Sequence, residues 1–471
     1  MAAIVTNKFR INNADQFYES FGEASATQYW LFVGRPQPFS TTTGGGTDSA
    51  PPTPLDNVVD EFIYFRDMIA AKRITSSDIS YVCPRHTWTT GTIYDYYRGD
   101  YGSTVAGSVV TTRAGGTNLW ASTTLFYVLN SSNQVWKCMW NATAAGTAVA
   151  SVNEPYQATP STTSELNTAD GYYWKYLYTL TTTEITNFLT TDFLPVHVDA
   201  AVQTGAVNGE ILHYKVDAAG SGYTPGTYTP VTVNGDGTTA ATVSILVDGS
   251  GTVSTVTAVT DGVGYTFASI TMPAGAGGGS GETITPIIGP KGGHGDNAIE
   301  GLGGYYVAMN TTIAGTAGSG DFVVDQDFRR IGVVRDPLNS SSAVPTATTL
   351  SALKSMTFSA SPTPGSFDAD QALTGGTSGA KGLVVSYDSS TRVLKYIQTQ
   401  YTGVDTDGDL TSFAASEVVT GTGGSTPTGT IATLAGSEIE YYSGDVIYAE
   451  NRSPITRAAD QTENIKLIIE F

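Results

Sequence analysis

Cysteine is nearly absent from this 471-residue chain, which contains only Cys83 and Cys138. Two cysteines so far apart in the sequence exclude a disulfide-rich scaffold. We expect two reduced, partly buried thiols, with a single disulfide bond as the alternative. No apolar run approaches the roughly 18 residues that indicate a membrane-spanning helix, and the N-terminus has no apolar signal segment. We therefore expect a soluble protein that is made in a cytoplasm.

Basic residues are also scarce. The chain has 23 Lys and Arg against 43 Asp and Glu, which gives a formal net charge of −20. Binding to nucleic acid depends on clusters of Lys and Arg that neutralise phosphates. No basic run occurs in the sequence, so the composition argues against a nucleic-acid partner. The negative charge favours solubility but does not specify a fold.

Gly, Thr, Ser and Tyr are abundant, with 53 Gly and 26 Tyr. Charged residues make up 14% of the chain, against about 25% in an average soluble protein. Thr, Val and Tyr favour strands, while Gly, Asn and Asp favour the turns between them. The length corresponds to about two to four domains. We expect a mainly β protein, with a discontinuous β-rich core, a few short helices and two inserted all-β modules.

Three short helices are predicted in the first 200 residues. Asn13 is predicted to cap the first and Gly22 to close it, with Phe17 and Phe21 four residues apart on one face. The second spans residues 55–71, and the third spans residues 183–189. The second has apolar residues at helical spacing, which predicts a buried face: Val58, Val59, Phe62, Ile63 and Ile69. Aromatic, alternating segments at 92–97, 118–130 and 133–140 predict strands.

A repeat marks the first inserted module, residues 208–285. The string GSGYT at 220–224 recurs as GVGYT at 262–266, 42 residues later. The sequence between the copies alternates between apolar and polar residues and contains Asn-Gly at 234–235 and Asp-Gly at 248–249. Both pairs predict hairpin turns. We interpret the segment as a rigid decorative β module built from two related halves, with a carbohydrate-binding module as the alternative.

A second Gly- and Thr-rich region, residues 344–435, has a weaker internal similarity and predicts a second inserted β module. The denser, more aromatic segments on either side predict one core that is interrupted twice. The predicted parts are the N-terminal core at 1–207, the first module at 208–285, the central core at 286–343, the second module at 344–435 and the C-terminal core at 436–471.

The string DTDGDL at 405–410 resembles a calcium loop but departs from the EF-hand pattern. Gly408 is at position four instead of six, and Ser416 occupies position twelve, where a bidentate Glu is required. A solvated acidic turn is the better interpretation. The Gly-rich strings PAGAGGGSGET and GPKGGHG lack the Lys-Ser/Thr pair of a phosphate-binding loop. We interpret them as a flexible link into the core.

No pattern predicts a cofactor, a metal site or a catalytic group. The four histidines have no metal-ligand spacing: His86, His197, His213 and His294. The chain has no Gly-x-Ser-x-Gly nucleophile elbow. We therefore expect that the protein is not an enzyme.

Several longer strings are more informative about the family of this protein than the patterns above. They include AIVTNKFRINNADQFYESFG at the start, LFVGRPQPF, SYVCPRHTWTTGTIYDYY, ADGYYWKYLYTL and DFVVDQDFRRIGVVRDPL. The most specific is the C-terminal string SGDVIYAENRSPITRAADQTENIKLIIEF. Together they resemble the baseplate wedge subunit of T-even-like contractile-tailed phages (myoviruses), the gene product eight family. The resemblance covers roughly the first 200 residues, the middle 50 and the last 34, and it excludes the two modules.

The resemblance implies a structural virion protein that is synthesised in the host cytoplasm and assembles into the tail baseplate. It implies a homodimer within each wedge, contacts with other wedge proteins in a sixfold baseplate, and no catalytic residue or cofactor. The two modules leave a host-recognition or glycan-binding tail protein as the alternative function, with a surface glycan as a possible partner.

The C-terminal string supplies the candidate site. Its family-motif residues are Tyr448, Glu450, Asn451, Arg452, Pro454, Asp460, Gln461 and Thr462. We expect Tyr448 to lie on a strand that Pro454 ends or borders, and Glu450 to pair with Arg452. The segment either packs against the N-terminal region or docks a neighbouring subunit.

Overall fold

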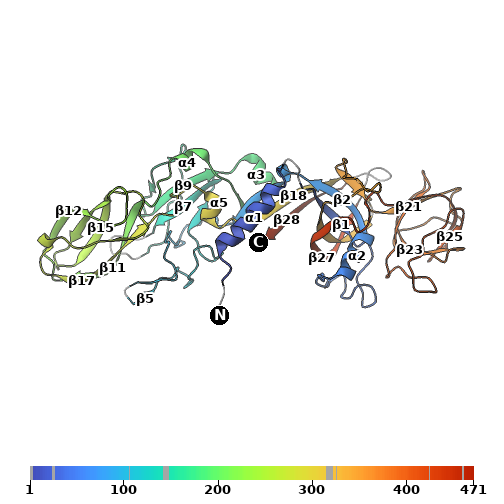
Figure 1. Ribbon diagram of the computed structural model, residues 1–471, viewed down its shortest axis with the longest axis horizontal. Helices are drawn as coiled ribbons and strands as arrows, with labels where there is room; N and C mark the ends of the chain where they lie inside the picture. The colour runs from blue at the N-terminus through green and yellow to red at the C-terminus, as the bar shows by residue number, and fades with distance from the viewer. Residues whose placement is uncertain are drawn as a thin grey trace. The chain divides into compact units, whose positions relative to one another are not determined.

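The computed structural model describes residues 4–23, 27–105, 107–141, 148–314, 322–324, 326–423, 425–458 and 461–471. Short strands dominate, and the helices are few and short (Figure 1). The prediction of a mainly β fold is therefore confirmed. Within the described part of the chain, no helix has the length and apolar character needed to cross a membrane.

The chain forms two compact units, and each unit combines segments that are distant in the sequence. The first unit comprises Met1–Gln16, Ser80–Ala308 and Ile468–Phe471, and the second comprises Phe17–Ile79 and Met309–Leu467. The four predicted boundaries between the five parts of the chain stay a prediction.

A five-stranded antiparallel sheet forms the centre of the second unit. Its order is β20 (Thr349–Ser351), β2 (Met68–Ile74), β1 (Tyr29–Gly34), β19 (Gln326–Arg335) and β27 (Asp445–Arg457). Every residue of β1 is buried. Both faces of the strand are therefore covered, which explains why its sequence is a continuous apolar run without alternating polar residues. The core packed around the sheet includes Trp30, Phe32, Phe65, Met68 and Val334.

The first helix, α1 (Asn7–Ser20), begins earlier than predicted. Thr6 precedes it and its hydroxyl accepts a hydrogen bond from the Phe9 N–H at 3.2 Å, so Thr6 caps the helix. The predicted start at Asn13 is therefore wrong. Phe17 and Phe21 lie on the same face of the chain here, and their rings meet edge to face with centroids 5.1 Å apart.

The second helix, α2 (Val58–Arg66), is shorter than the predicted 55–71. The Asn57 side chain accepts hydrogen bonds from two backbone N–H groups of the first turn, which fixes the start. The helix ends because the next apolar residues form β2, where Ala71 lies opposite Phe32 of β1. Pairing with the sheet overrides the helical periodicity. The third helix, α3 (Thr182–Asn187), confirms the third predicted helix, with ends shifted by one or two residues.

A four-stranded sheet in the first unit has the order β6 (Tyr127–Leu129), β7 (Gln134–Trp140), β9 (Tyr173–Thr179) and β8 (Leu166–Asn167). It confirms the strand predicted at 133–140. The strand predicted at 118–130 is correct only for its last residues.

The strand predicted at 92–97 is wrong, because this segment forms only an isolated bridge at Thr92. Side-chain hydrogen bonds hold this segment in place of strand pairing. The Asp95 carboxylate accepts hydrogen bonds from the backbone N–H groups of Arg113 and Leu125.

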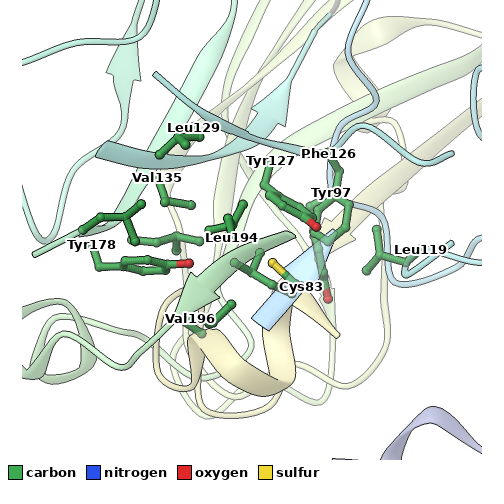
Figure 2. Close-up of a cluster of buried hydrophobic side chains, with 14 of the residues drawn as sticks. Cys83, Tyr97, Leu119, Phe126, Tyr127, Leu129, Val135, Tyr178, Leu194 and Val196 are labelled. Atoms are coloured by element: carbon green, nitrogen blue, oxygen red, sulfur yellow. The ribbon is translucent and has the colours of Figure 1, made fainter. Parts of the chain in front are cut away.

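A buried apolar cluster joins several elements of the first unit (Figure 2). It includes Phe126, Leu129 of β6, Val135 of β7 and Leu194 of β10 (Phe193–Val196). Cys83 also lies in this cluster, and Cys138 lies in a second one. Both thiols are buried and free, which confirms the expected reduced state and removes the disulfide alternative.

The remaining elements are short or pair in small sheets. They comprise a four-stranded sheet of the order β10, β3 (Ile79–Pro84), β18 (Tyr306–Ala314) and β28 (Thr462–Glu470), a hairpin of β4 (Thr104–Val105) and β5 (Ser108–Val109), and the helices α4 (Ala200–Thr204) and α5 (Ala298–Leu302).

Residues 211–288 form the repeat-containing β region. β11 (Ile211–Ser221) pairs with β17 (Ser280–Ile288), while β12 (Gly226–Thr232), β14 (Thr242–Val247) and β15 (Val253–Thr260) form a second sheet. β11 and β15 begin 42 residues apart and are therefore equivalent strands of the two halves. β11 pairs with β17, which follows it by about 60 residues, whereas β15 pairs with β14, which directly precedes it.

The repeated strings adopt the same local structure. Gly220 and Gly262 have φ of 61° and 67°, and Gly222 and Gly264 both have φ of 80°. These values lie in the left-handed region that favours glycine. The tyrosines of the two strings, at 223 and 265, are both buried in one core. The structure thus supports two related halves.

One of the two predicted hairpin turns is wrong. Asn234–Gly235 forms a short strand, β13, that pairs with β16 (Ala268–Ser269). Asp248 does form the turn between β14 and β15, and its carboxylate accepts hydrogen bonds from the Ser250 and Thr252 N–H groups at 2.9 and 3.0 Å.

A closed barrel occupies residues 354–435 of the second unit. Its strands, in spatial order, are β21 (Lys354–Phe358), β24 (Val393–Ile397), β23 (Lys381–Asp388), β22 (Ala372–Gly375), β25 (Val418–Gly421) and β26 (Thr428–Ala435). Closure removes the exposed strand edges. The DTDGDL string forms a turn on this barrel in which the Asp405 carboxylate accepts from the Asp407 and Asp409 N–H groups, both at 2.9 Å.

The GPKGGHG string is packed, which corrects the interpretation of this part as a flexible link. The Gly289 N–H donates to the Glu210 carbonyl at 2.8 Å, and the Gly292 N–H donates to the Asn208 side chain at 2.9 Å. A side chain at Gly293 would collide with the backbone of Val207. Close packing therefore explains why glycine occupies these positions. His294 of the same string is buried.

Candidate assembly surface

Three of the family-like strings meet on neighbouring strands of the second unit. Gly34 of β1 lies opposite Arg330 of β19, and Arg330 lies opposite Asn451 of β27. The strings GRPQPF, DFRRIGVV and YAENRSPI therefore form one row across the sheet, although more than 100 residues separate each string from the next. Such a row can be read only from the strand register.

Arg330 and the buried carboxylate of Asp67 form the centre of this row. Arg330 Nη1 lies 2.8 Å from both Asp67 oxygens, and Arg35 Nη1 lies 3.9 Å from one of them. The Arg330 guanidinium also covers the Tyr64 ring at 4.2 Å. Burial raises the pKa of Asp67, and the positive charges of Arg330 and Arg35 oppose that shift. The carboxylate is thus held by paired charges inside the unit.

Asn451 links this ion pair to the chain before α2. Its Oδ1 accepts a hydrogen bond from Arg330 Nε at 3.0 Å, and its Nδ2 donates to the Pro52 carbonyl at 2.9 Å. Both ends of the amide are therefore used within the unit. This geometry supports packing against the N-terminal region as the role of Asn451.

Arg329 points to the opposite face of β19, as successive strand residues do. Its Nε and Nη2 lie 3.0 Å from the two Asp48 oxygens, and Nη2 also lies 3.1 Å from Asp327. Two consecutive arginines thus attach both faces of the strand to segments near the N-terminus. No local pattern in the sequence indicates Asp48 or Asp67 as the partners of these arginines.

The other described motif residues are half-buried or exposed. The Tyr448 hydroxyl donates to Glu450 at 3.0 Å, and the predicted pair of Glu450 with Arg452 forms at 3.3 Å. The exposed members are Arg452, Pro454, Gln461 and Thr462. Asp460 lies outside the described residues. A role of these residues in assembly stays a prediction.

An exposed apolar surface lies around α2, and we call it the α2 patch. It consists of Leu55, Val58, Val59, Phe62 and Tyr442. Val58 is 66%, Val59 64% and Phe62 41% exposed. The Phe62 and Tyr442 rings touch, with centroids 4.6 Å apart. The buried side of α2 consists instead of Ile63, Tyr64 and Phe65.

The prediction that Val58, Val59 and Phe62 face the core is therefore wrong. The helical spacing predicted the helix correctly, but it did not show which side of the helix is buried within this chain. Contiguous exposed apolar surface is typical of protein–protein contacts.

The exposed α2 patch is typical of a surface that contacts another protein. Residues 3–129 match the family model Phage-Gp8, described as Bacteriophage T4, Gp8. The resemblance to the gene product eight family is thus confirmed over this part of the chain, which includes α1, β1, α2 and β2. The family indicates a structural protein of the phage baseplate. No curated protein matches the chain.

Proposed function

We propose that this chain is a wedge subunit of the baseplate in a contractile phage tail. In this role it forms a homodimer and holds neighbouring wedge proteins together in the sixfold baseplate. The observation that carries the proposal is the α2 patch, because four of its five residues fall within the family match at 3–129. A subunit that assembles permanently keeps apolar surface for its partners.

The composition of the α2 patch suits an interface. Aromatic side chains and Arg are the residues that most often dominate binding energy, and the Arg66 guanidinium lies 5.5 Å from the centre of the Tyr442 ring beside Phe62. Burying one Val or Phe side chain fully stabilises a contact by about 1.5–3 kcal/mol. The patch therefore offers enough apolar surface to anchor a neighbouring subunit.

Replacing Val59 by Asp together with Phe62 by Ala is expected to weaken assembly with neighbouring wedge proteins at least tenfold. Loss of two central interface residues typically costs more than about 1 kcal/mol each, and about 1.4 kcal/mol is a factor of ten in affinity. The helix should persist, since Asp at the second position of α2 interacts favourably with the helix N-terminus. Analytical ultracentrifugation of the subunit with its wedge neighbours measures the effect.

Val344→Asp is the matched control, because Val344 is equally exposed in a loop of the same unit. It should assemble like the unmodified chain. Equal assembly of the α2 variant and the control, with both folded by circular dichroism, would exclude the α2 patch as the contact.

The glycan-binding alternative gains no support from the repeated strings. Sugar rings stack on exposed aromatic faces, whereas Tyr223 and Tyr265 of these strings are buried in the core of the region, and Phe267, which is exposed, lies just outside the strings. The Tyr265 hydroxyl accepts a hydrogen bond from the Ala241 N–H at 2.9 Å. Both tyrosines are therefore explained by folding.

A further inference from the structure

A cavity of about 650 Å³ opens in the first unit beside the apolar cluster of Figure 2. Tyr97 and Leu119, which both line it, are labelled at the right-hand side of that cluster. Cavities of about 300–1,000 Å³ are the size that holds small organic ligands. The GPKGGHG loop and the segment that precedes α1 form other parts of the wall.

The aromatic part of the wall is held in place. The Trp120 indole N–H donates to the Gly301 carbonyl at 3.2 Å, and the ring packs so closely on Gly303 that a side chain there would collide with it. Gly303 has φ of 73°, a left-handed conformation that favours glycine. Tyr101 is fixed by its hydroxyl, which donates to the Tyr96 carbonyl at 2.9 Å. The cavity thus has an ordered aromatic surface.

The cavity is positively charged in an otherwise acidic chain. Among the described residues that line it, the basic ones are Lys8, Arg98, Lys137 and Lys291, and the acidic one is Glu300. Glu300 pairs with Lys8 at 3.0 Å, and Asp100 pairs with Arg98 through two contacts of 2.8 Å. The charges of Lys8 and Arg98 are therefore already balanced.

Lys137 is a buried cation of the wall, with 2% of its surface exposed, and unlike the buried Arg98 it has no carboxylate partner among the described residues. Its Nζ lies 3.0 Å from His294 Nδ1 and 4.1 Å from the centre of the Tyr97 ring. No described carboxylate lies within ion-pair distance of it. An ammonium group has three N–H donors, so this geometry leaves donors available to a further acceptor.

The surrounding groups do not supply a matching negative charge. Burial and the charges of Lys137 and Lys175 hold the pKa of His294 well below its usual value, so the imidazole is neutral. Burial lowers the pKa of Lys137 to about 7, despite the nearby Glu210. Burial also raises the pKa of Glu210 to about 7. Glu210 acts on both Lys137 and Lys175, so the charge of this carboxyl is shared between two buried ammonium groups.

We propose that this cavity binds a small organic anion, with its carboxylate or phosphate group on Lys137 and its apolar body against Tyr101 and Trp120. The anion supplies the acceptor and the negative charge that the chain itself does not provide there. A charge-assisted hydrogen bond of this kind is roughly twice as strong as a neutral one, which makes the anionic group the main determinant of recognition. No residue of the α2 patch lines the cavity.

The test compares 3-phenylpropionate with its neutral analogue 3-phenylpropanol by isothermal titration calorimetry on the full chain at pH 6. The acid should bind at least ten times more tightly than the alcohol. Lys137→Met should abolish this preference and is expected to fold, because it removes an unbalanced buried charge. Lys381→Met, which makes the same change in net charge on the barrel, should leave the preference unchanged.

A third readout is the pH profile. The affinity for the acid should fall as the pH rises past 7, while the affinity for the alcohol should not change. Equal affinity for acid and alcohol, absence of binding by both at millimolar concentration, or a preference that survives in Lys137→Met would each overturn the proposal.

Discussion

Replacing Asp67 by Ala is expected to destabilise the second unit by about 3–5 kcal/mol, which is the cost of leaving a buried partner charge uncompensated. The change removes the carboxylate that Arg330 contacts twice at 2.8 Å and that Arg35 approaches. Hydrogen exchange of the β1 and β19 amides measures the loss, because these strands form the centre of that unit.

Asp445→Ala is the matched control. It removes another Asp–Arg pair, with Arg335, from the same sheet, but Asp445 and Arg335 are 63% and 46% exposed. An exposed pair contributes about 0–1 kcal/mol. Equal protection of the β1 amides in both variants would contradict the assignment of Asp67 as the centre of a buried ion pair.

Replacing Phe126 by Ala is expected to destabilise the first unit by about 3–5 kcal/mol, because it removes a fully buried ring and leaves a cavity. Phe126 lies in the cluster of Figure 2 and meets the Tyr127 ring edge to face, with centroids 5.0 Å apart. Five of the six tryptophans lie in this unit, so urea unfolding followed by tryptophan fluorescence reports mainly on it.

Phe267→Ala is the control in the same unit, since the Phe267 ring is 64% exposed. Exposed substitutions usually change stability by about 0.5 kcal/mol or less. A midpoint for Phe126→Ala as high as that for Phe267→Ala would show that the cluster does not determine the stability of the unit.

The mainly β fold followed from composition, and the repeat followed from two strings that differ at one position. The strings predicted two related halves because glycines at fixed spacing demand a particular backbone, and Gly222 and Gly264 indeed share φ of 80°. The pairing of the halves was not predictable. It depends on which strands meet in space, and Asn234–Gly235 joined a strand although the pair is typical of a hairpin turn.

The candidate site was predictable only as separate strings. Asp67 and Arg330 are 263 residues apart, and no local pattern predicts a contact at that separation. The stripe of Val58, Val59 and Phe62 was recognised but assigned to the core. An apolar helix face has the same periodicity whether its own chain or another protein covers it, so only the structure separates these two cases.

The most direct test of a baseplate role is an electron cryo-microscopy reconstruction of the intact phage that encodes this chain. We predict that density for the five-stranded sheet and the six-stranded barrel will be found in the tail baseplate, repeated around its sixfold axis, with the α2 patch covered by a neighbouring subunit. Finding the chain in purified capsids without tails, and not in the baseplate, would contradict the account.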